Sequence, residues 1–119
     1  ALDDLDVAPP ATKWPAPLAT EAFHGLVGEI VRTIEPHTEA DPAALLIQFL
    51  CAYGNVIGRG AHFRAEADKH HTNLFCCLVG QTSKGRKGTS WGYVRDRFAS
   101  IDKGWLDGRV LGGLSSGDG

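Results

Sequence analysis

Residues 78–94 read LVGQTSKGRKGTSWGYV: the apolar end of a strand, a glycine-rich basic loop and the start of a helix. This order is typical of loops that hold the phosphates of a nucleotide. Glycine lets backbone N–H groups approach the anion closely, and the following helix adds the positive end of its dipole. Four residues separate Gly80 from Gly85, as in such loops, but Arg86 stands where a lysine is usual and Lys87 follows it. The stretch therefore predicts a phosphate-binding loop whose end is shifted by one residue.

Two lysines are candidates for the residue that neutralises the phosphates. Lys87 takes this role if the loop has one extra residue, whereas Lys84 would reach the phosphates from the side. We favour Lys87, since it stands at the expected start of the helix and since the planar guanidinium of Arg86 is no simple substitute. Thr89 or Ser90 would hold Mg²⁺, and we prefer Thr89. The candidate nucleotide-binding residues are Gly80, Gln81, Thr82, Ser83, Lys84, Gly85, Arg86, Lys87, Gly88, Thr89 and Ser90.

The composition predicts one small globular domain. The chain has 119 residues, of which 43% are hydrophobic and 22% charged, and its net charge of −2 gives no general attraction to nucleic acid or anionic lipid. No apolar stretch approaches the roughly 20 residues of a membrane helix, and we expect no signal peptide. The three cysteines, Cys51, Cys76 and Cys77, are an odd number that favours buried free thiols and a cytoplasmic location over a disulfide framework.

The first half of the chain predicts a helical hairpin. Residues 1–19 form a proline-rich extended lead, and residues 20–59 form the helical part. Apolar residues at helical spacing predict a first helix from Thr20, its expected N-cap, to Pro36. Asp41 and Pro42 predict the start of a second helix with a wide apolar face, formed by Leu45, Leu46, Phe49, Leu50 and Tyr53 and loosened or ended by Gly54 and Gly58.

Residues 60–119 carry the expected sheet and the loop. Residues 61–67 alternate apolar and polar side chains, which predicts a half-exposed strand, and residues 68–73 predict a turn. Residues 73–80, NLFCCLVG, are a continuous apolar run that fits a strand buried on both faces, as in a parallel sheet. Residues 89–102 predict a helix whose core-facing stripe is Trp91, Val94 and Phe98. Residues 113–119, GLSSGDG, are either a second loop or a flexible end.

The stretches KWPAPL (13–18), ADPAALLIQFLCAYGNVIGRG (40–60), residues 70–94 and GLSSGDG resemble the N-terminal part of a family of bacterial P-loop proteins from plasmids, phages and other mobile elements. That family is similar to RepA/DnaB-type replicative helicases with a RecA-like core. The resemblance covers most of the chain from about Trp14 onward. In that family the loop lysine, here Lys87, binds ATP phosphates, and a Ser or Thr follows it where this chain has Gly88.

The resemblance implies an α/β fold: a helical hairpin beside the start of a RecA-like P-loop sheet. It implies ATP and Mg²⁺ as cofactors, DNA as a partner through the full-length protein, no membrane, and a homo-oligomer that is a hexamer if the protein is helicase-like. It also implies that this chain is the front of a longer ATPase whose catalytic acids lie elsewhere. Asp107 and Asp118 stand in glycine-rich turns. The catalytic residues are therefore unknown, and we expect this piece to bind nucleotide with little or no turnover.

Three other interpretations stay open beside this one. In the first, the loop is only a basic turn. In the second, the loop and the helix bind a nucleic-acid backbone without a nucleotide. In the third, the chain is a helical segment that assembles subunits. A zinc site at His70, His71, Cys76 and Cys77 is not favoured, because neither adjacent pair has the spacing of two to four residues between ligands that structural zinc sites use.

Overall fold

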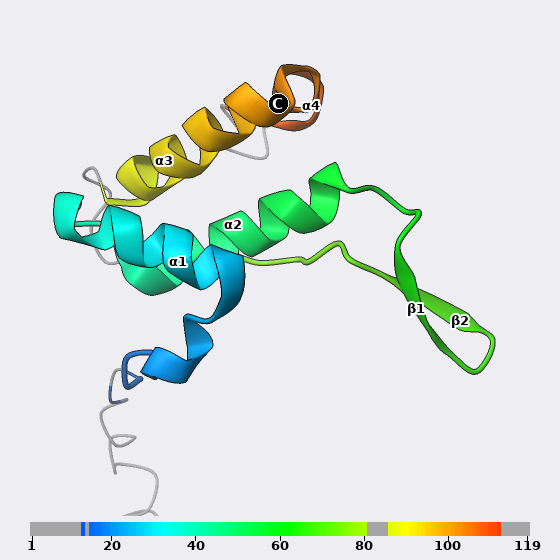
Figure 1. Ribbon diagram of the computed structural model, residues 1–119, viewed down its shortest axis with the longest axis horizontal. Coiled ribbons are helices and arrows are strands. Elements are labelled where there is room, and N and C mark those ends of the chain that lie inside the picture. The colour runs from blue at the N-terminus through cyan, green and yellow to red at the C-terminus, as the bar shows by residue number, and fades with distance from the viewer. Residues whose placement is uncertain (1–12, 14, 81–85, 113–119) are drawn as a thin grey trace, which may run out of the picture.

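The computed structural model describes residues 13, 15–80 and 86–112 of the chain (Figure 1). This part is mixed α/β, with four α-helices and one two-stranded antiparallel sheet, which confirms the expected class in its general form. None of its helices has the length and apolar character that a membrane span requires. The elements are the 3-10 helices η2 (Thr20–Ala22) and η3 (Glu35–His37), the helices α1 (Gly25–Ile34), α2 (Pro42–Val56), α3 (Arg86–Ile101) and α4 (Lys103–Arg109), and the strands β1 (His62–Ala65) and β2 (Asp68–His71).

The core lies between three helices. Helix α2 packs against both α1 and α3, and α4 folds back on α3. The ring centroids of Phe49 and Phe98 are 6.3 Å apart, and Trp105 extends this pair at 5.5 Å from Phe98. Each large apolar side chain buried in this way contributes about 1.5–3 kcal/mol. The buried apolar residues are Val31, Ala40, Leu45, Leu46, Phe49, Ala52, Val94 and Phe98.

Helix α2 begins and ends where its local signals predict. The Asp41 Oδ1 accepts a hydrogen bond from the N–H of Ala43 at 2.8 Å, so the expected N-cap before Pro42 is confirmed. Gly58 follows the helix with φ at +73°, a conformation that glycine adopts without steric cost. The predicted apolar face is wider than the face of α2 that is buried, because its outer residues Leu50 and Tyr53 are exposed.

Helix α1 begins later than predicted. Thr20 starts the short turn η2 rather than capping α1, which begins at Gly25 after His24. Gly25 has φ at +66°, outside the helical region, so it interrupts a continuous helix. The backbone of Phe23 then folds against Gly28, where an added Cβ would lie 2.3 Å from the Phe23 carbonyl. The expected end is confirmed: α1 stops at Ile34 and η3, which contains Pro36, follows.

The hairpin of β1 and β2 corrects two expectations. The predicted strand over 61–67 is shorter, and the predicted turn over 68–73 is wrong because Asp68–His71 forms strand β2. His62 pairs with His71 and Ala65 with Asp68, so the chain reverses at Glu66 and Ala67. The polar residues of β2 suggest a turn when read alone, but the hairpin projects away from the helices and exposes both strands almost entirely (Figure 1).

Residues 73–80 do not form the predicted buried strand. The segment is irregular, and Leu74, Phe75 and Val79 are 50%, 94% and 81% exposed. A strand needs a neighbouring strand for its ladder of hydrogen bonds. Among the described residues β1 and β2 pair only with each other, and no RecA-like sheet is formed. The segment instead runs along α2 and leads back toward the start of α3 (Figure 1).

The chain crosses α2 at Gly54, just before this segment. The Thr72 hydroxyl donates a hydrogen bond to the carbonyl oxygen of Gly54 at 2.9 Å. A Cβ added at Gly54 would lie 2.1 Å from the carbonyl oxygen of Thr72. Gly54 therefore does not loosen or end α2, as the sequence pattern suggested. It provides the space for a close backbone crossing.

Helix α3 confirms the helix predicted after the loop, and its core-facing stripe is confirmed as well. Val94 and Phe98 are buried and Trp91 packs against the same core. Helix α4 was not predicted: Asp107 lies within it rather than in a glycine-rich turn. The carboxylate of Asp102 caps α4 by accepting a hydrogen bond from the N–H of Trp105 at 3.0 Å.

Candidate functional site

The expected nucleotide loop is described at its two ends. Gly80 is the exposed end of the extended segment, and α3 begins at Arg86. The residues between them, Gln81, Thr82, Ser83, Lys84 and Gly85, lie outside the described residues. The backbone of Arg86, Lys87 and Gly88 therefore forms the first turn of a 16-residue helix. The first N–H groups of such a helix have no intrahelical acceptor, so they can bind an anion at its positive end.

The two candidate hydroxyl groups have different surroundings. Thr89 is exposed, whereas Ser90 is completely buried. A metal ligand has to reach a solvated ion at the phosphates, so accessibility favours Thr89 over Ser90 in that role. Ser90 is then part of the inner face of α3, one residue before Trp91.

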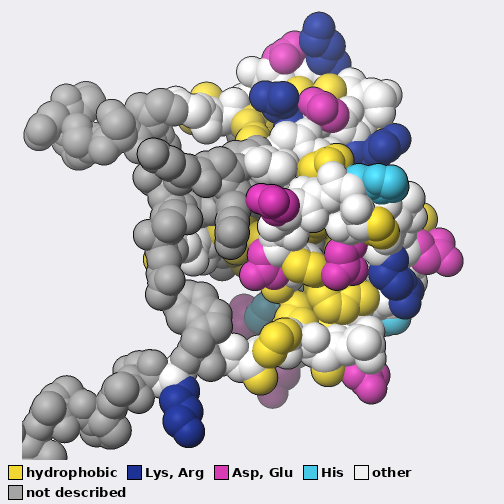
Figure 2. Space-filling model, turned by 90° about the vertical axis from the view of Figure 1, so that its left-hand side faces the viewer, with side chains coloured by type: hydrophobic (Ala, Val, Ile, Leu, Met, Phe, Trp, Pro, Cys, Tyr) yellow, Lys and Arg dark blue, Asp and Glu magenta, His cyan; other side chains and the backbone are white. Residues whose placement is uncertain are grey.

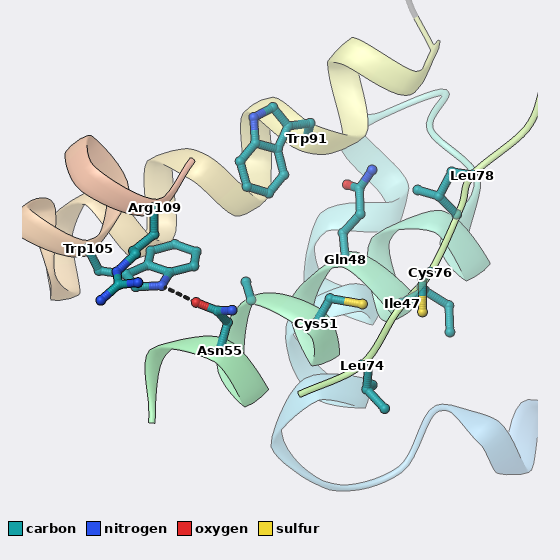
Figure 3. Close-up of a pocket in the computed structure, with 11 residues that line it drawn as sticks. Ile47, Gln48, Cys51, Asn55, Leu74, Cys76, Leu78, Trp91, Trp105 and Arg109 are labelled. Atoms are coloured by element: carbon teal, nitrogen blue, oxygen red, sulfur yellow. Dashed lines mark hydrogen bonds between the residues drawn. The ribbon is translucent and has the colours of Figure 1, made fainter. Parts of the chain in front are cut away.

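A pocket of about 280 Å³ lies behind the extended segment, between α2, α3 and α4 (Figure 3). The indole Nε1–H of Trp105 donates a hydrogen bond to Asn55 Oδ1 at 2.8 Å and joins α4 to α2. The Gln48 Oε1 is buried and has no hydrogen-bond partner among the residues that the structure describes. Sequence reasoning missed this pocket, because no spacing connects its elements. Its walls are Ile47, Gln48, Cys51, Ala52, Asn55, Leu74, Cys76, Leu78, Trp91, Trp105 and Arg109.

The cysteines differ from the expected buried thiols. Cys76 and Cys77 are exposed and Cys51 is half-buried. Cys51 and Cys76 line the same pocket, and Figure 3 shows the sulfur of Cys51 directed from α2 toward the extended segment, where Cys76 lies. Burial raises the pKa of the Cys51 thiol to about 11, with a smaller contribution from the neighbouring Cys76. No sequence pattern indicates this pair, because 24 residues separate its two members.

We expect Cys51 to be alkylated slowly near neutral pH. Only the thiolate reacts, so the raised pKa predicts a rate that rises about tenfold per pH unit from about pH 7 to pH 9. The other charged or titratable groups on the same pocket wall are Cys76 and Arg109. Iodoacetamide labelling followed by peptide mass spectrometry measures the rate, with the exposed Cys77 as internal reference. Labelling of Cys51 as fast as that of Cys77 at neutral pH would contradict the burial of its thiol.

The histidines of the hairpin come close together in one place. The rings of His62 and His71 face each other across the two strands with centroids 5.8 Å apart. Within residues 13, 15–80 and 86–112, no three His, Cys, Asp or Glu side chains are grouped so that they could hold a metal ion. A role for Mg²⁺ therefore rests on the loop and its nucleotide.

Comparison of the chain with protein-family models, with curated proteins and with solved structures gave no match. The resemblance to P-loop ATPases thus stands on the quoted motifs alone, and the function is inferred from the loop and the elements that flank it.

Proposed function

We propose that residues 80–90 bind the phosphates of ATP and that the chain is the N-terminal portion of a DNA-linked, helicase-like P-loop ATPase of a mobile element. The observation that carries the proposal is the start of α3 at Arg86, directly after the glycine-rich basic loop. An apolar extended segment enters the loop at Gly80 and a long helix leaves it. This is the arrangement that phosphate-binding loops use.

Each part of the loop has a distinct task in this proposal. The N–H groups of the loop and of the first turn of α3 surround the phosphate oxygens, and the helix dipole adds to their attraction. The ammonium of Lys87, or of Lys84 in the alternative alignment, neutralises the β- and γ-phosphates. Thr89, an exposed residue, supplies the hydroxyl that holds Mg²⁺. Arg86 is no simple substitute for the lysine in the phosphate contact, because a guanidinium is bulkier and planar.

The apolar character of residues 73–80 supports a larger sheet. Leu74, Cys76 and Leu78 line the pocket against α2, whereas Phe75 and Val79 are exposed. A strand of a parallel sheet is apolar on both faces because helices cover both. In the proposed RecA-like core, further strands would pair with this segment and a second layer would cover Phe75 and Val79.

Binding without turnover is the expected behaviour of these residues. Phosphoryl transfer needs an acid that orders Mg²⁺ and a residue that activates water. Asp96 lies beside Arg95, with 3.4 Å between Oδ1 and the guanidinium, and Asp107 lies in α4. In the proposal the catalytic acids come from other strands of the RecA-like core. DNA binding, hexamer formation and a cytoplasmic location belong to the same proposal.

We expect Lys87→Ala to weaken MgATP binding by about tenfold to a hundredfold, because a hydrogen bond to a charged group contributes about 1.5–3 kcal/mol. Calorimetric titration of MgATP into the full-length protein measures the affinity. Lys69→Ala is the matched control, since Lys69 is an exposed lysine on β2 and should leave the affinity unchanged. A loss in Lys84→Ala instead would assign the phosphate contact to Lys84. Wild-type affinity in both loop variants would refute the proposed site.

The nucleic-acid alternative has less support from the surface. On the face shown in Figure 2, dark blue basic and magenta acidic side chains are interspersed among apolar ones over the described residues. Arg95 on α3 is in contact with Asp96 rather than part of a one-sign patch. Backbone binding would weaken with salt by a log–log slope of about −0.9 for each phosphate contacted. A steep slope without any need for Mg²⁺ or ATP would favour the alternative.

A further inference from the structure

We propose that Cys51 and Cys76 are a redox modification site, at which exchange with a small-molecule disulfide of the glutathione type forms a reversible bond that fixes the extended segment 73–80 to helix α2. This inference is independent of the proposed nucleotide site, because it concerns the segment before the loop and not the loop itself.

The two cysteines come from different parts of the chain and meet at one pocket. Cys51 lies on α2 and Cys76 on the extended segment, and both line the pocket between them. Figure 3 shows both side chains on the wall of this pocket, with the sulfur of Cys51 directed toward the segment that carries Cys76. A disulfide requires Cβ atoms about 3.5–4.5 Å apart. In the proposal, small movements of the extended segment, which has no strand partner among the described elements, bring the two Cβ atoms to this distance.

The structure also selects between two adjacent cysteines. Successive side chains of an extended segment point to opposite sides. Both residues are exposed, but Cys76 lines the pocket against α2, whereas the neighbouring Cys77 takes no part in the pocket wall. The bond should therefore join Cys51 to Cys76 and not to Cys77, although the stretches of chain closed by these two disulfides would differ in length by only one residue.

The bond would change the attachment of the segment. Residues 73–80 have no strand partner among the described elements, and just before them the Thr72 hydroxyl is hydrogen-bonded to Gly54. A covalent link at Cys76 restrains the segment four residues before Gly80, where the loop begins. Disulfides in a reducing compartment are usually transient and redox-sensing, which fits an exposed thiol beside a half-buried one.

The exchange proceeds in two balanced steps. The exposed thiolate of Cys76 attacks glutathione disulfide, forms a mixed disulfide and releases one glutathione thiolate. The Cys51 thiolate then attacks the Cys76 sulfur, forms the protein disulfide and releases the second glutathione. The two protein thiols together lose two protons and two electrons, and glutathione disulfide takes up both to become two glutathione thiols. Excess reduced glutathione reverses the reaction.

The test compares the chain with Cys77→Ser and Cys76→Ser after incubation with glutathione disulfide. Peptide mass spectrometry without reduction identifies the linked residues, and iodoacetamide marks the remaining free thiols. We expect the wild type and Cys77→Ser to form the same Cys51–Cys76 link. We expect Cys76→Ser to form the Cys51–Cys77 link at least about tenfold more slowly, because the Cys77 side chain points away from α2.

A denatured sample provides the reference for this selectivity. In guanidinium chloride the chain is unfolded, and the stretches from Cys51 to Cys76 and from Cys51 to Cys77 are almost equally long. Cys51 should therefore link to the two cysteines at similar rates. The same lack of preference in the folded chain would overturn the proposal. So would a dominant Cys76–Cys77 bond, or a failure of Cys77→Ser to form any internal disulfide. Slower proteolysis within residues 73–80 after oxidation, restored by reduced glutathione, would support the proposed restraint.

Discussion

Gly54→Ala is expected to destabilise the chain by about 1–3 kcal/mol, the usual cost of inserting an atom where none fits. The added Cβ would lie 2.1 Å from the carbonyl oxygen of Thr72, so the helix and the crossing chain would have to move apart. Alanine would otherwise favour α2 by about 1 kcal/mol over glycine. The clash outweighs this gain because the atom in the way is backbone and cannot rotate aside. Separation would also break the hydrogen bond from Thr72 to Gly54.

Gly92→Ala is the matched control for this substitution. Gly92 lies in the interior of α3, and a Cβ added there meets nothing within 4 Å. Its replacement should stabilise the chain by up to about 1 kcal/mol through helix propensity alone. Urea unfolding followed by circular dichroism measures both variants. If Gly54→Ala were stabilising like Gly92→Ala, the crossing of Thr72 over α2 would not exist in solution.

Leu45→Ala is expected to cost about 2.7–5 kcal/mol, the range for removing a fully buried leucine side chain from a packed core. Leu45 is 0% exposed and belongs to the cluster that joins α1, α2 and α3. Small domains have total stabilities of about 5–15 kcal/mol, so this single change would remove a large part of the folding free energy. The denaturation midpoint in urea should fall while the slope stays the same.

Leu50→Ala on the same helix tests whether burial causes this effect. Leu50 is 36% exposed, and the same atoms are removed, so its cost should be well below that of Leu45→Ala, at about 1 kcal/mol. Equal losses at the two positions would mean that α2 turns a different face to the core.

Local signals were sufficient to predict the helices of this chain in large part. The start of α2 depends on Asp41 and Pro42, whose effects act within a few residues, and both acted as expected. The inner stripe of α3 follows from helical periodicity. The start of α1 was wrong because Gly25 adopts a positive φ that no residue spacing indicates. Helix α4 was missed because Gly104 and Gly108 lower its propensity, while its cap at Asp102 compensates.

Strand β1 lies within the predicted range 61–67, but the predictions for residues 68–73 and 73–80 failed, because a strand depends on its neighbours. Residues 68–71 are too polar to suggest a strand, yet they pair with β1 through backbone hydrogen bonds. Residues 73–80 are apolar enough for a buried strand, yet no described strand lies beside them. The contact between Cys51 and Cys76 and the pocket around it depend on how this segment passes α2. Such long-range placement has no periodicity that the sequence alone can show.

The exposed segment 73–80 also bears on how the protein behaves at high concentration. A run of six or seven apolar residues without proline or charge, presented with an open backbone, is the pattern of segments that stack into cross-β aggregates. Leu74 to Val79 meet this description, and Phe75 is almost fully accessible. Lysines and an arginine on either side, Lys69, Lys84, Arg86 and Lys87, act as gatekeepers whose mutual repulsion opposes stacking. Among these cations, the loop lysines Lys84 and Lys87, which are proposed to attract phosphate, would thus also keep neighbouring copies of the chain apart.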